Sequence, residues 1–311
     1  MLWCRGAYNS LENVTPLMVA AGESLKQGGH VYYLSTGSIA VLTTIDASEC
    51  PPTFGSKFTD VQAFVHNGWK NMGNRDGDLT SVSEKFHLSW DDFEKEALPN
   101  LTSADLVLFV DFDDDANPAT ADIQRLLQEV RKTPANLSAL LIARRLQTET
   151  KLRSFLTQTV RVCAVVAVPY VDIVPGLRSF GELAAKFALN AISTYAHVAI
   201  GKVYKNRMID LSVSNTKLFH RSVNIVSELM GVSTEEATTC ILRSIYLVDD
   251  LTSDITERSI SRHLEAATTG RSKVVPLALI LASTPMPVAQ ALEKLDAQPI
   301  VRKLIAEAAR P

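Results

Sequence analysis

Five short apolar runs recur in the first half of the chain, and a segment with helical periodicity follows each of them. Continuous runs rich in β-branched residues are typical of strands buried on both faces of a parallel sheet. The runs are His30–Ser35, Val61–His66, Leu106–Phe112, Ala139–Ala143 and Val160–Val168. Because strands alternate with helices, the pattern predicts an α/β fold with a doubly wound five-stranded parallel sheet and right-handed crossovers.

Helix signals support this alternation. Ser89 stands three residues before Asp92, a capping pattern that predicts a helix over Trp90–Leu98. Pro118 opens the periodic stretch Ala121–Val130, and proline is favoured in the first turn of a helix.

The second half of the chain has a different character. A long, strand-free helical pattern runs from Phe180 to Arg207, and its dense alanines predict close packing on the sheet or on a second subunit, with Phe180–Ile200 as the candidate interface. From Leu218 onward the chain is predicted to be all helical, and Ser233 with Glu236 forms a capping pattern for a helix at 234–246. Further helices are expected over Ile260–Thr268, Val274–Ala282, Val288–Leu295 and Ile300–Ala308. We therefore predict a sheet domain over residues 1–212 and a helical domain over 213–311.

Composition and charge exclude several classes of function. The chain has 311 residues, a net charge of −3 and a pI near 6.1, a balance that does not favour nucleic acid or anionic lipid as a partner. The four cysteines lie far apart, and the six histidines show no metal-ligand spacing, so neither a disulfide framework nor a metal site is expected. Without a leader or a 20-residue apolar run, the sequence predicts a soluble cytoplasmic protein.

The turn after the first strand is one candidate site. Ser35, Thr36 and Ser38 surround Gly37 between a strand and a helix, where hydroxyls and backbone N–H groups can hold a phosphate. An ordinary N-cap explains the same residues equally well.

A second candidate is Glu49, in the segment I-D-A-S-E-C-P-P-T-F-G at residues 45–55. Pro51 and Pro52 are expected to end the preceding helix, which would leave Glu49 at a helix C-terminus, where the macrodipole disfavours a carboxylate. A residue kept in an unfavourable position is a reasonable site candidate. A salt-bridged surface glutamate is the alternative.

This segment resembles the signature of the N-acetylmuramic acid 6-phosphate etherases, a family that shares ancestry with the glucokinase regulatory proteins. The resemblance covers most of the chain. It includes H-V-Y-Y-L at 30–34, F-T-D-V-Q-A-F at 58–64, the acidic-aromatic stretch at 89–98, L-N-A-I-S-T-Y-A-H-V-A-I-G-K at 189–202 and M-I-D-L-S-V-S-N-T-K-L-F at 208–219. It implies a sugar isomerase (SIS) domain followed by a helical lid, and it is closest to the second SIS half of the regulatory proteins.

The chain departs from the etherases at the phosphate loops. Where that family has a glycine-rich loop after the first strand, residues 35–41 read S-T-G-S-I-A-V, and the hydroxyl-rich loop after the third strand becomes D-F-D-D-D-A-N at 111–117. Before the long helix, residues 174–180 read V-P-G-L-R-S-F, in which Arg178 survives but the phosphate-binding hydroxyls of the family's motif do not. Four carboxylates would repel a phosphate dianion by several kcal/mol in a partly desolvated site. The sequence therefore predicts that this domain does not hold a phosphoryl group unaided.

Catalysis by the etherase route is also not expected. That chemistry needs one group to remove a carbon-bound proton and another to protonate the leaving oxygen. Glu49 matches the first glutamate of the etherases, and their second motif, E-G-A-E-D, is replaced by N-G-W-K-N-M-G-N-R-D-G-D at 67–78.

In the tail, Lys273 and Arg271 match a lid segment whose lysine approaches the sugar phosphate in related proteins. A solvated basic turn is the other interpretation.

The resemblance thus implies a non-catalytic regulatory segment without cofactors. It would bind a hexose phosphate of the fructose 6-phosphate or fructose 1-phosphate class together with a second SIS domain or a second copy, and modulate a sugar kinase. A regulator of this class could also act in the nucleus. Because the chain starts abruptly in the helix before the first strand, we expect a fragment or one partner of a dimer.

Four other interpretations stay open: a working etherase, an interaction scaffold that binds no sugar, and, at Asp111-Phe112-Asp113, either a phosphatase-like D-x-D motif or an acidic Mg²⁺ site. A solvated loop that caps the next helix explains these aspartates more simply.

Overall fold

A computed structural model shows two compact units. The first comprises residues 1–50 and 57–199, and the second comprises residues 51–56 and 200–311. The structure describes residues 11–73, 79–115, 117, 119–146, 149–169, 178–269 and 273–308. The sequence placed the boundary near residue 212, whereas residues 200–212 belong to the helical unit in this division.

The first unit contains the predicted parallel sheet. Its order is β2-β1-β3-β4-β5, and all neighbouring strands run parallel. The strands are β1 (Val31–Ser35), β2 (Val61–Val65), β3 (Leu106–Phe112), β4 (Asn136–Ala143) and β5 (Cys163–Ala167). Every residue of β3 is buried, as its continuous apolar sequence requires in the middle of a covered sheet.

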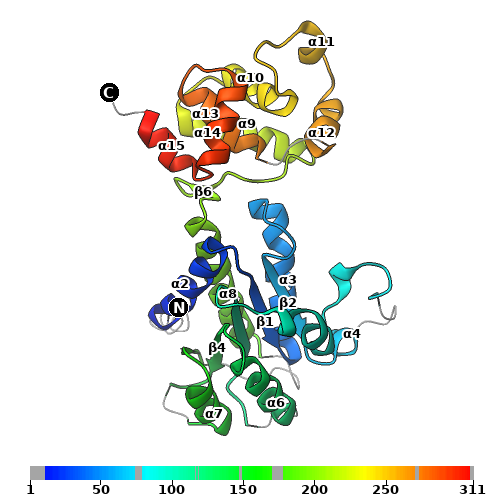
Figure 1. The fold of residues 1–311 in the computed structure, drawn as a ribbon, viewed down its shortest axis with the longest axis vertical. Coiled ribbons are helices and arrows are strands. Elements are labelled where there is room, and N and C mark those ends of the chain that lie inside the picture. The colour runs from blue at the N-terminus through cyan, green and yellow to red at the C-terminus, as the bar shows by residue number, and fades with distance from the viewer. Residues whose placement is uncertain are drawn as a thin grey trace. The chain divides into compact units, whose positions relative to one another are not determined.

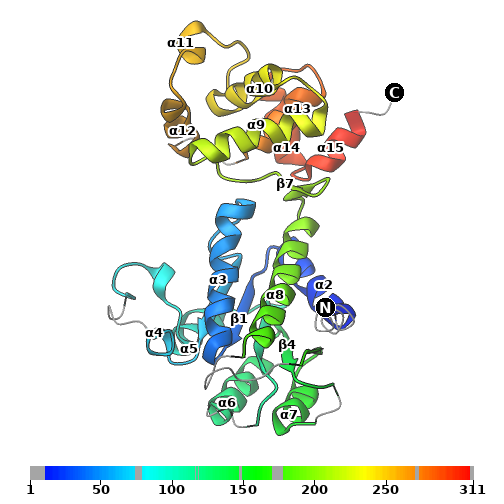
Figure 2. The ribbon, with the colours of Figure 1, turned by 180° about the vertical axis from the view of Figure 1, so that it is seen from behind.

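Helices cover both faces of this sheet (Figure 1). On one face lie α2 (Thr15–Lys26), α3 (Gly37–Phe54) and α8 (Phe180–Ala199), which Figure 2 shows in front of the strands. Of the alanines of α8 that were expected to pack closely, Ala184, Ala185, Ala188 and Ala196 are buried and Ala191 is partly buried. The exposed apolar side chains of this helix are Phe180, Leu183, Phe187 and Tyr195. On the other face, α6 (Thr120–Arg131) and α7 (Lys151–Thr159) pack their leucines on β1, β3 and β4.

The segment predicted as one helix over Trp90–Leu98 is divided. A single α-turn, α5 (Trp90–Asp92), continues as a π-helix, η3 (Phe93–Ala97), and then as a 3₁₀ turn, η4 (Leu98–Asn100). The capping box is present, because the Ser89 side chain accepts from the Asp92 N–H and the Asp92 carboxylate accepts from the Ser89 N–H. The short elements of this unit are η1 (Leu11–Val14), α4 (Gly68–Asn71) and η2 (Glu84–Phe86).

The expectation that Pro51 ends helix α3 is wrong. The helix continues to Phe54 with both prolines inside it, and the Gly55 N–H donates to the Pro51 carbonyl at 2.9 Å. Proline has a helical φ, and its lost hydrogen bonds are confined here to the last turn. Glu49 therefore lies more than one turn before the helix end, and the argument from the macrodipole at this position does not hold.

The second unit is helical after a short hairpin. The long helix predicted to reach Arg207 ends at Ala199, and the chain then forms β6 (Val203–Tyr204) and β7 (Arg207–Met208). Gly201, with φ +86°, lies after the helix end in a conformation that favours glycine. The helices that follow are α9 (Thr216–Met230), α10 (Thr234–Tyr246), α11 (Ser253–Thr256), α12 (Ile260–Thr269), α13 (Val274–Ser283), α14 (Val288–Ala297) and α15 (Val301–Ala308).

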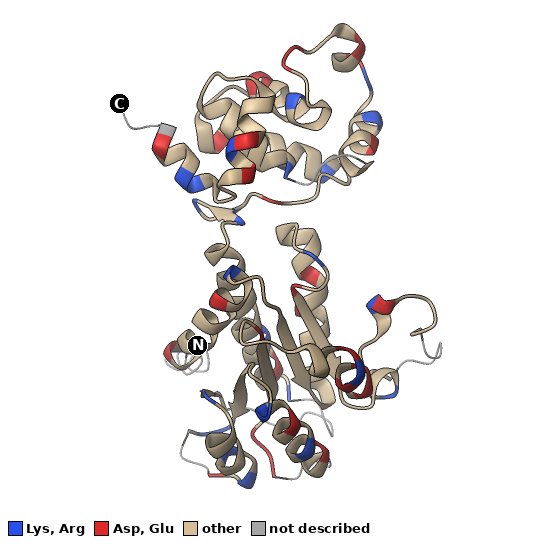
Figure 3. Cartoon of the chain, viewed as in Figure 1, with Lys and Arg blue, Asp and Glu red and all other residues tan. Residues whose placement is uncertain are grey.

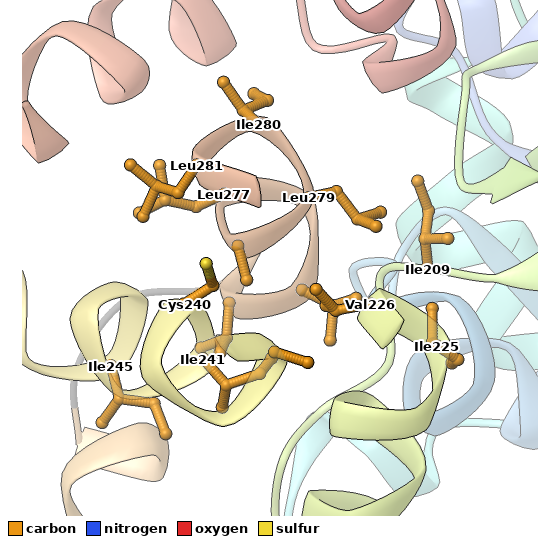
Figure 4. Close-up of a cluster of buried hydrophobic side chains, with 14 of the residues drawn as sticks. Ile209, Ile225, Val226, Cys240, Ile241, Ile245, Leu277, Leu279, Ile280 and Leu281 are labelled. Carbon is orange, nitrogen blue, oxygen red and sulfur yellow. The ribbon is translucent and has the colours of Figure 1, made fainter. Parts of the chain in front are cut away.

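Helix α13 is the centre of this unit. It is buried from Val274 to Leu281 and packs against α9 and α10, while Ile280 points away from these two helices (Figure 4). Among the described helices, none is by itself long and apolar enough to span a bilayer. Only the pair α13 and α14, bent by 115°, passes such a test by length and composition. Charged residues of both signs are interspersed on each unit (Figure 3).

A substitution at Gly55 tests how tightly the segment after α3 is packed. A Cβ at this position, where φ is +58°, would lie 2.3 Å from the Asp210 carbonyl oxygen. Gly55→Ala should lower the free energy of unfolding by about 3 kcal/mol, through strain and overpacking together. Gly231→Ala is the matched control, because φ is +69° there and nothing lies within 4 Å. It should cost about 1 kcal/mol in urea denaturation; equal losses would contradict the steric account.

Candidate functional site

The carboxyl ends of β1 and β3 meet in a network of buried polar groups. The Thr36 hydroxyl donates to Asp111 Oδ2, and Asn117 Nδ2 donates to the same carboxylate oxygen and to Thr36 Oγ1, both at 3.0 Å. The other oxygen, Oδ1, accepts from the Phe112 N–H at 2.7 Å. This edge is where ligands bind in open parallel sheets. Here a carboxylate of the chain itself takes up the donors that a bound anion would need.

Asp111 is close to fully buried, and burial is the main cause of its altered titration. Desolvation raises the pKa of its carboxyl from 3.8 to about 6, against the opposing effects of its hydrogen bonds and of the Arg178 charge. The D-x-D interpretation required an ionised, ligand-facing carboxylate. Both Asp111 oxygens are instead engaged by groups of the protein.

The other aspartates of this loop are also paired. Asp113, whose side chain is 1% exposed, forms an ion pair with Arg153 and accepts from the Thr150 hydroxyl. Asp114 pairs with Arg178 at 2.5 Å. Asp115 Oδ1 accepts from the Leu152 N–H at 3.2 Å, at the start of α7.

Arg178 has a second contact that fixes its position. Its guanidinium carbon lies 4.4 Å from the centroid of the Phe112 ring, a cation–π geometry. The arginine that matches the etherase phosphate loop is therefore held by an aspartate and an aromatic ring from the loop after β3. Its family motif, at residues 174–180, lies mostly outside the described residues.

The hydroxyls of the first turn are largely engaged. The Ser35 side chain is buried and bonds the Thr43 hydroxyl at 2.7 Å, inside α3. Thr36 is committed to Asp111. Ser38, partly exposed in the first turn of α3, has no side-chain hydrogen bond to the described residues. Of the three hydroxyls predicted as a cradle, only Ser38 is free for a ligand in the described part of the chain.

Glu49 lies opposite a lysine of α8. Lys186 Nζ is 2.8 Å from Glu49 Oε2 and 3.5 Å from Asp46 Oδ1, so it bridges two carboxylates of α3. Asp46 also accepts from the buried hydroxyl of Tyr33 at 3.2 Å. Burial raises the pKa of Asp46, while Lys186 and the hydroxyl of Ser193 lower it. Ser193 thus has a structural role as a hydrogen-bond partner of Asp46.

The Glu49 side chain is 58% exposed, and its carboxylate is engaged in an ion pair with Lys186. A second acid–base carboxylate would have been expected from residues 67–78, of which residues 74–78 lie outside the described residues.

In the helical unit, Lys273 lies just before α13 with φ +71°. Its charge lowers the pKa of Asp210, which burial raises. Asp210 forms an ion pair with Lys202, and Lys202 Nζ also donates to the Gly55 carbonyl at 3.3 Å. The conserved-looking G-K and M-x-D pieces of the resemblance thus meet as a buried charge pair. Arg271 lies outside the described residues.

Three side chains that sequence spacing did not single out come together near the π-helix. Ligand atoms of His87, Asp92 and Glu96 lie within 4.8 Å of one another. His87 Nδ1 is 2.5 Å from Glu96 Oε1, and this bond is the main cause of the raised His87 pKa. Asp92 is occupied by its capping bonds to Ser89. The pairing of the His87 imidazole with the Glu96 carboxylate accounts for the closeness of these groups without a bound ion.

Sequence reasoning missed most of the partners of the acidic loop. Arg153 sits on α7 and Thr150 is its N-cap, and neither carries a motif. Asn117 had a usable signal, because an asparagine between an aspartate run and a proline favours local capping bonds. The two carboxylate partners of Lys186 follow only from the packing of α3 on α8.

Replacing Asp111 by asparagine should remove one pH-dependent loss of stability. Because the carboxyl has a pKa near 6 when folded and 3.8 otherwise, the folded state binds more protons between these values. The free energy of unfolding should therefore fall as the pH rises from about 4 to about 6, by up to about 3 kcal/mol. Asp111→Asn should lack this part of the slope in urea denaturation. Parallel curves for the two proteins would contradict the assignment.

Lys186→Met should destabilise the chain far more than Glu49→Gln. The methionine leaves the Asp46 carboxylate, 1% exposed, without its cation, at a cost of about 3 kcal/mol. Glu49 is mostly exposed, so losing its pair should cost less than about 1 kcal/mol. The double variant Asp46→Asn/Lys186→Met should recover part of the loss. Denaturation at neutral pH measures all three, and similar losses for both single variants would refute this division of roles.

Comparison with known proteins identifies the family. A model of the second SIS domain of glucokinase regulatory protein matches residues 8–200, and a model of the C-terminal lid domain of glucokinase regulatory protein matches residues 205–305.

The similar proteins include glucokinase regulatory proteins and N-acetylmuramic acid 6-phosphate etherases, the two families that the sequence resembles. Glucokinase regulatory protein from Xenopus laevis is 31% identical over 88% of this chain and 44% of that protein, and the Homo sapiens protein is 29% identical over 97% and 48%. An N-acetylmuramic acid 6-phosphate etherase from Francisella tularensis subsp. holarctica is 29% identical over 71% of this chain and 69% of the etherase. The chain spans about half the length of the regulatory proteins it matches.

The predicted fold, an SIS-type sheet followed by a helical lid, is confirmed, and the chain belongs to the glucokinase regulatory protein family, where it corresponds to the second SIS domain and the lid.

Proposed function

We propose that this chain is a non-catalytic regulatory segment that responds to a hexose phosphate and modulates a sugar kinase. In this proposal the phosphoryl group is held by another SIS domain, either in the same polypeptide or in a second copy. The names of the most similar relatives support the kinase as partner. Fructose 6-phosphate and fructose 1-phosphate are the effectors we propose to test.

One observation carries the proposal: the loop after β3 fills the anion-binding edge of the sheet with its own carboxylates. Asp111 accepts hydrogen bonds from Thr36 and Asn117. Asp113 forms an ion pair with Arg153, and Asp114 forms one with Arg178. A phosphate would have to displace these pairs and leave carboxylates buried beside its own charge. Breaking a buried pair in this way costs about 3–5 kcal/mol.

The etherase alternative has less support. Glu49 matches one etherase glutamate, but its carboxylate is bound to Lys186 and lies on an α-helix with a paired, buried aspartate beside it. Proton abstraction needs a base within hydrogen-bond reach of the substrate proton, and this carboxylate is already held in an ion pair. The filled edge of the sheet is equally compatible with an interaction scaffold that binds no sugar. Only a binding experiment separates that hypothesis from our proposal.

Titration calorimetry on the full chain tests the proposal. Fructose 6-phosphate or fructose 1-phosphate should give no saturable heat with the chain alone, which means a dissociation constant above about 1 mM. Glucokinase should bind the chain, and supplying a first SIS domain should make that binding respond to the sugar phosphate. Lys273→Ala should weaken the response, and Lys217→Ala, at an exposed lid lysine, is its control.

Three results would overturn this function. A hexose phosphate bound by the isolated chain at Ser35–Ser38 and the Asp113 loop would remove its physical basis. Turnover of N-acetylmuramic acid 6-phosphate would favour the etherase. Kinase binding that ignores the sugar phosphate even with a first SIS domain present would favour the scaffold.

A further inference from the structure

A cavity of about 290 Å³ lies beside β2, the strand at the edge of the sheet. Its walls come from α3, the first half of β2, α4 and the turn η2. This volume is close to the share of about ten water molecules in the liquid, and it is near the lower limit for small-molecule sites. It is large enough for a small ligand.

The walls of this β2-edge cavity are mainly apolar and partly aromatic. Phe58, Trp69 and Phe86 line it, and the Trp69 and Phe86 rings lie 5.8 Å apart between centroids. Phe58 remains 39% exposed despite its size. Ala63, at the centre of β2, contributes only a methyl group. A flat apolar group in the cavity would cover these rings from water.

One buried donor in the wall has no acceptor. The indole Nε1 of Trp69 is buried and makes no hydrogen bond in the described part of the chain. The indole of Trp90, in the same unit, donates to the Phe64 carbonyl at 3.2 Å. Buried indole N–H groups nearly always find an acceptor, because an unmade bond costs the full desolvation penalty. Trp69 therefore calls for an acceptor that the described residues do not supply.

Two basic side chains, Lys85 and His87, are among the described residues that line the cavity, and none of these is an aspartate or glutamate. His87 is already paired with Glu96. Lys85 is exposed, its ammonium lies 5.9 Å from the centroid of the Phe58 ring, and it has no carboxylate partner within the described ranges. Within those ranges, the Lys85 ammonium is therefore available to pair with an anion.

The cavity is separate from the anion-binding edge of the sheet. It is lined by Val61 and Ala63 of β2, and by Ala47 and Ser48 of α3. The neighbouring residues Asp46 and Glu49 point instead to Lys186 of α8. The described lining of the cavity includes none of Thr36, Asp111 and Asn117.

We propose that the β2-edge cavity binds a small monocarboxylate with a flat apolar body. The body packs on Phe58, Trp69 and Phe86, the carboxylate pairs with Lys85, and an acceptor oxygen satisfies the Trp69 indole. This site is independent of the hexose phosphate and of the kinase.

The test is a titration of the full chain with 4-phenylbutyrate, followed by the indole N–H signals in ¹H–¹⁵N spectra. Trp69→Phe assigns the signal of Trp69 among the three tryptophans. The Trp69 signal should move downfield and saturate, with a dissociation constant of about 1 mM or tighter, while the Trp90 signal stays in place. The uncharged 4-phenylbutyramide should bind about fivefold more weakly, which is the effect expected for one exposed ion pair.

Variants assign the contacts. Lys85→Gln should weaken binding of the carboxylate about fivefold and leave binding of the amide unchanged, and Lys57→Gln, at an exposed lysine outside the cavity, should alter neither. Ala63→Phe should fill the cavity and abolish binding. If this variant does not fold, the proposal is decided by the affinities of Lys85→Gln for the acid and for the amide. No saturable shift of Trp69, equal binding of acid and amide, or unchanged binding by folded Ala63→Phe would overturn the proposal.

Discussion

A buried carboxylate must either be neutralised or have its oxygens fully hydrogen-bonded, and this requirement organises the carboxyl edge of the sheet. Asp111 sits at the end of the fully buried strand β3, where water cannot solvate it. Thr36, Asn117 and the Phe112 N–H provide the bonds it needs. The turn after β1 is therefore tied to the loop after β3, and the space where related folds hold an anion is filled from within.

The same constraint acts between α3 and α8. Asp46 is buried under the helices, where desolvation raises the pKa of its carboxyl, and the Lys186 ammonium approaches from α8 and opposes this shift. Glu49 is one turn further along and shares that lysine. A glutamate that matches a catalytic residue elsewhere in the family thus becomes part of the charge pairing that joins two helices. The signature motif thus has a packing role, whatever chemistry it serves elsewhere.

Much of the fold could be predicted because its signals are local. Each strand is a continuous apolar run, and each run became a strand within a few residues of its predicted bounds. The caps at Ser89 and Ser233 also act within one helical turn. The errors occurred where tertiary packing overrides local preference. Pro51 and Pro52 stay inside α3, and Gly201 with the hairpin after it ends a helix whose pattern ran on.

By itself the sequence determined the class of fold, the order of the strands and helices, and the loss of the phosphate-binding hydroxyls, because periodicity and residue identity are properties of neighbouring residues. Only the tertiary structure decided what the new aspartates do. Arg153 and Arg178 reach them from 40 and 64 positions away, and Lys186 reaches Glu49 across 137. Partners so far apart leave no periodic trace, since they are brought together by the packing of whole helices on the sheet.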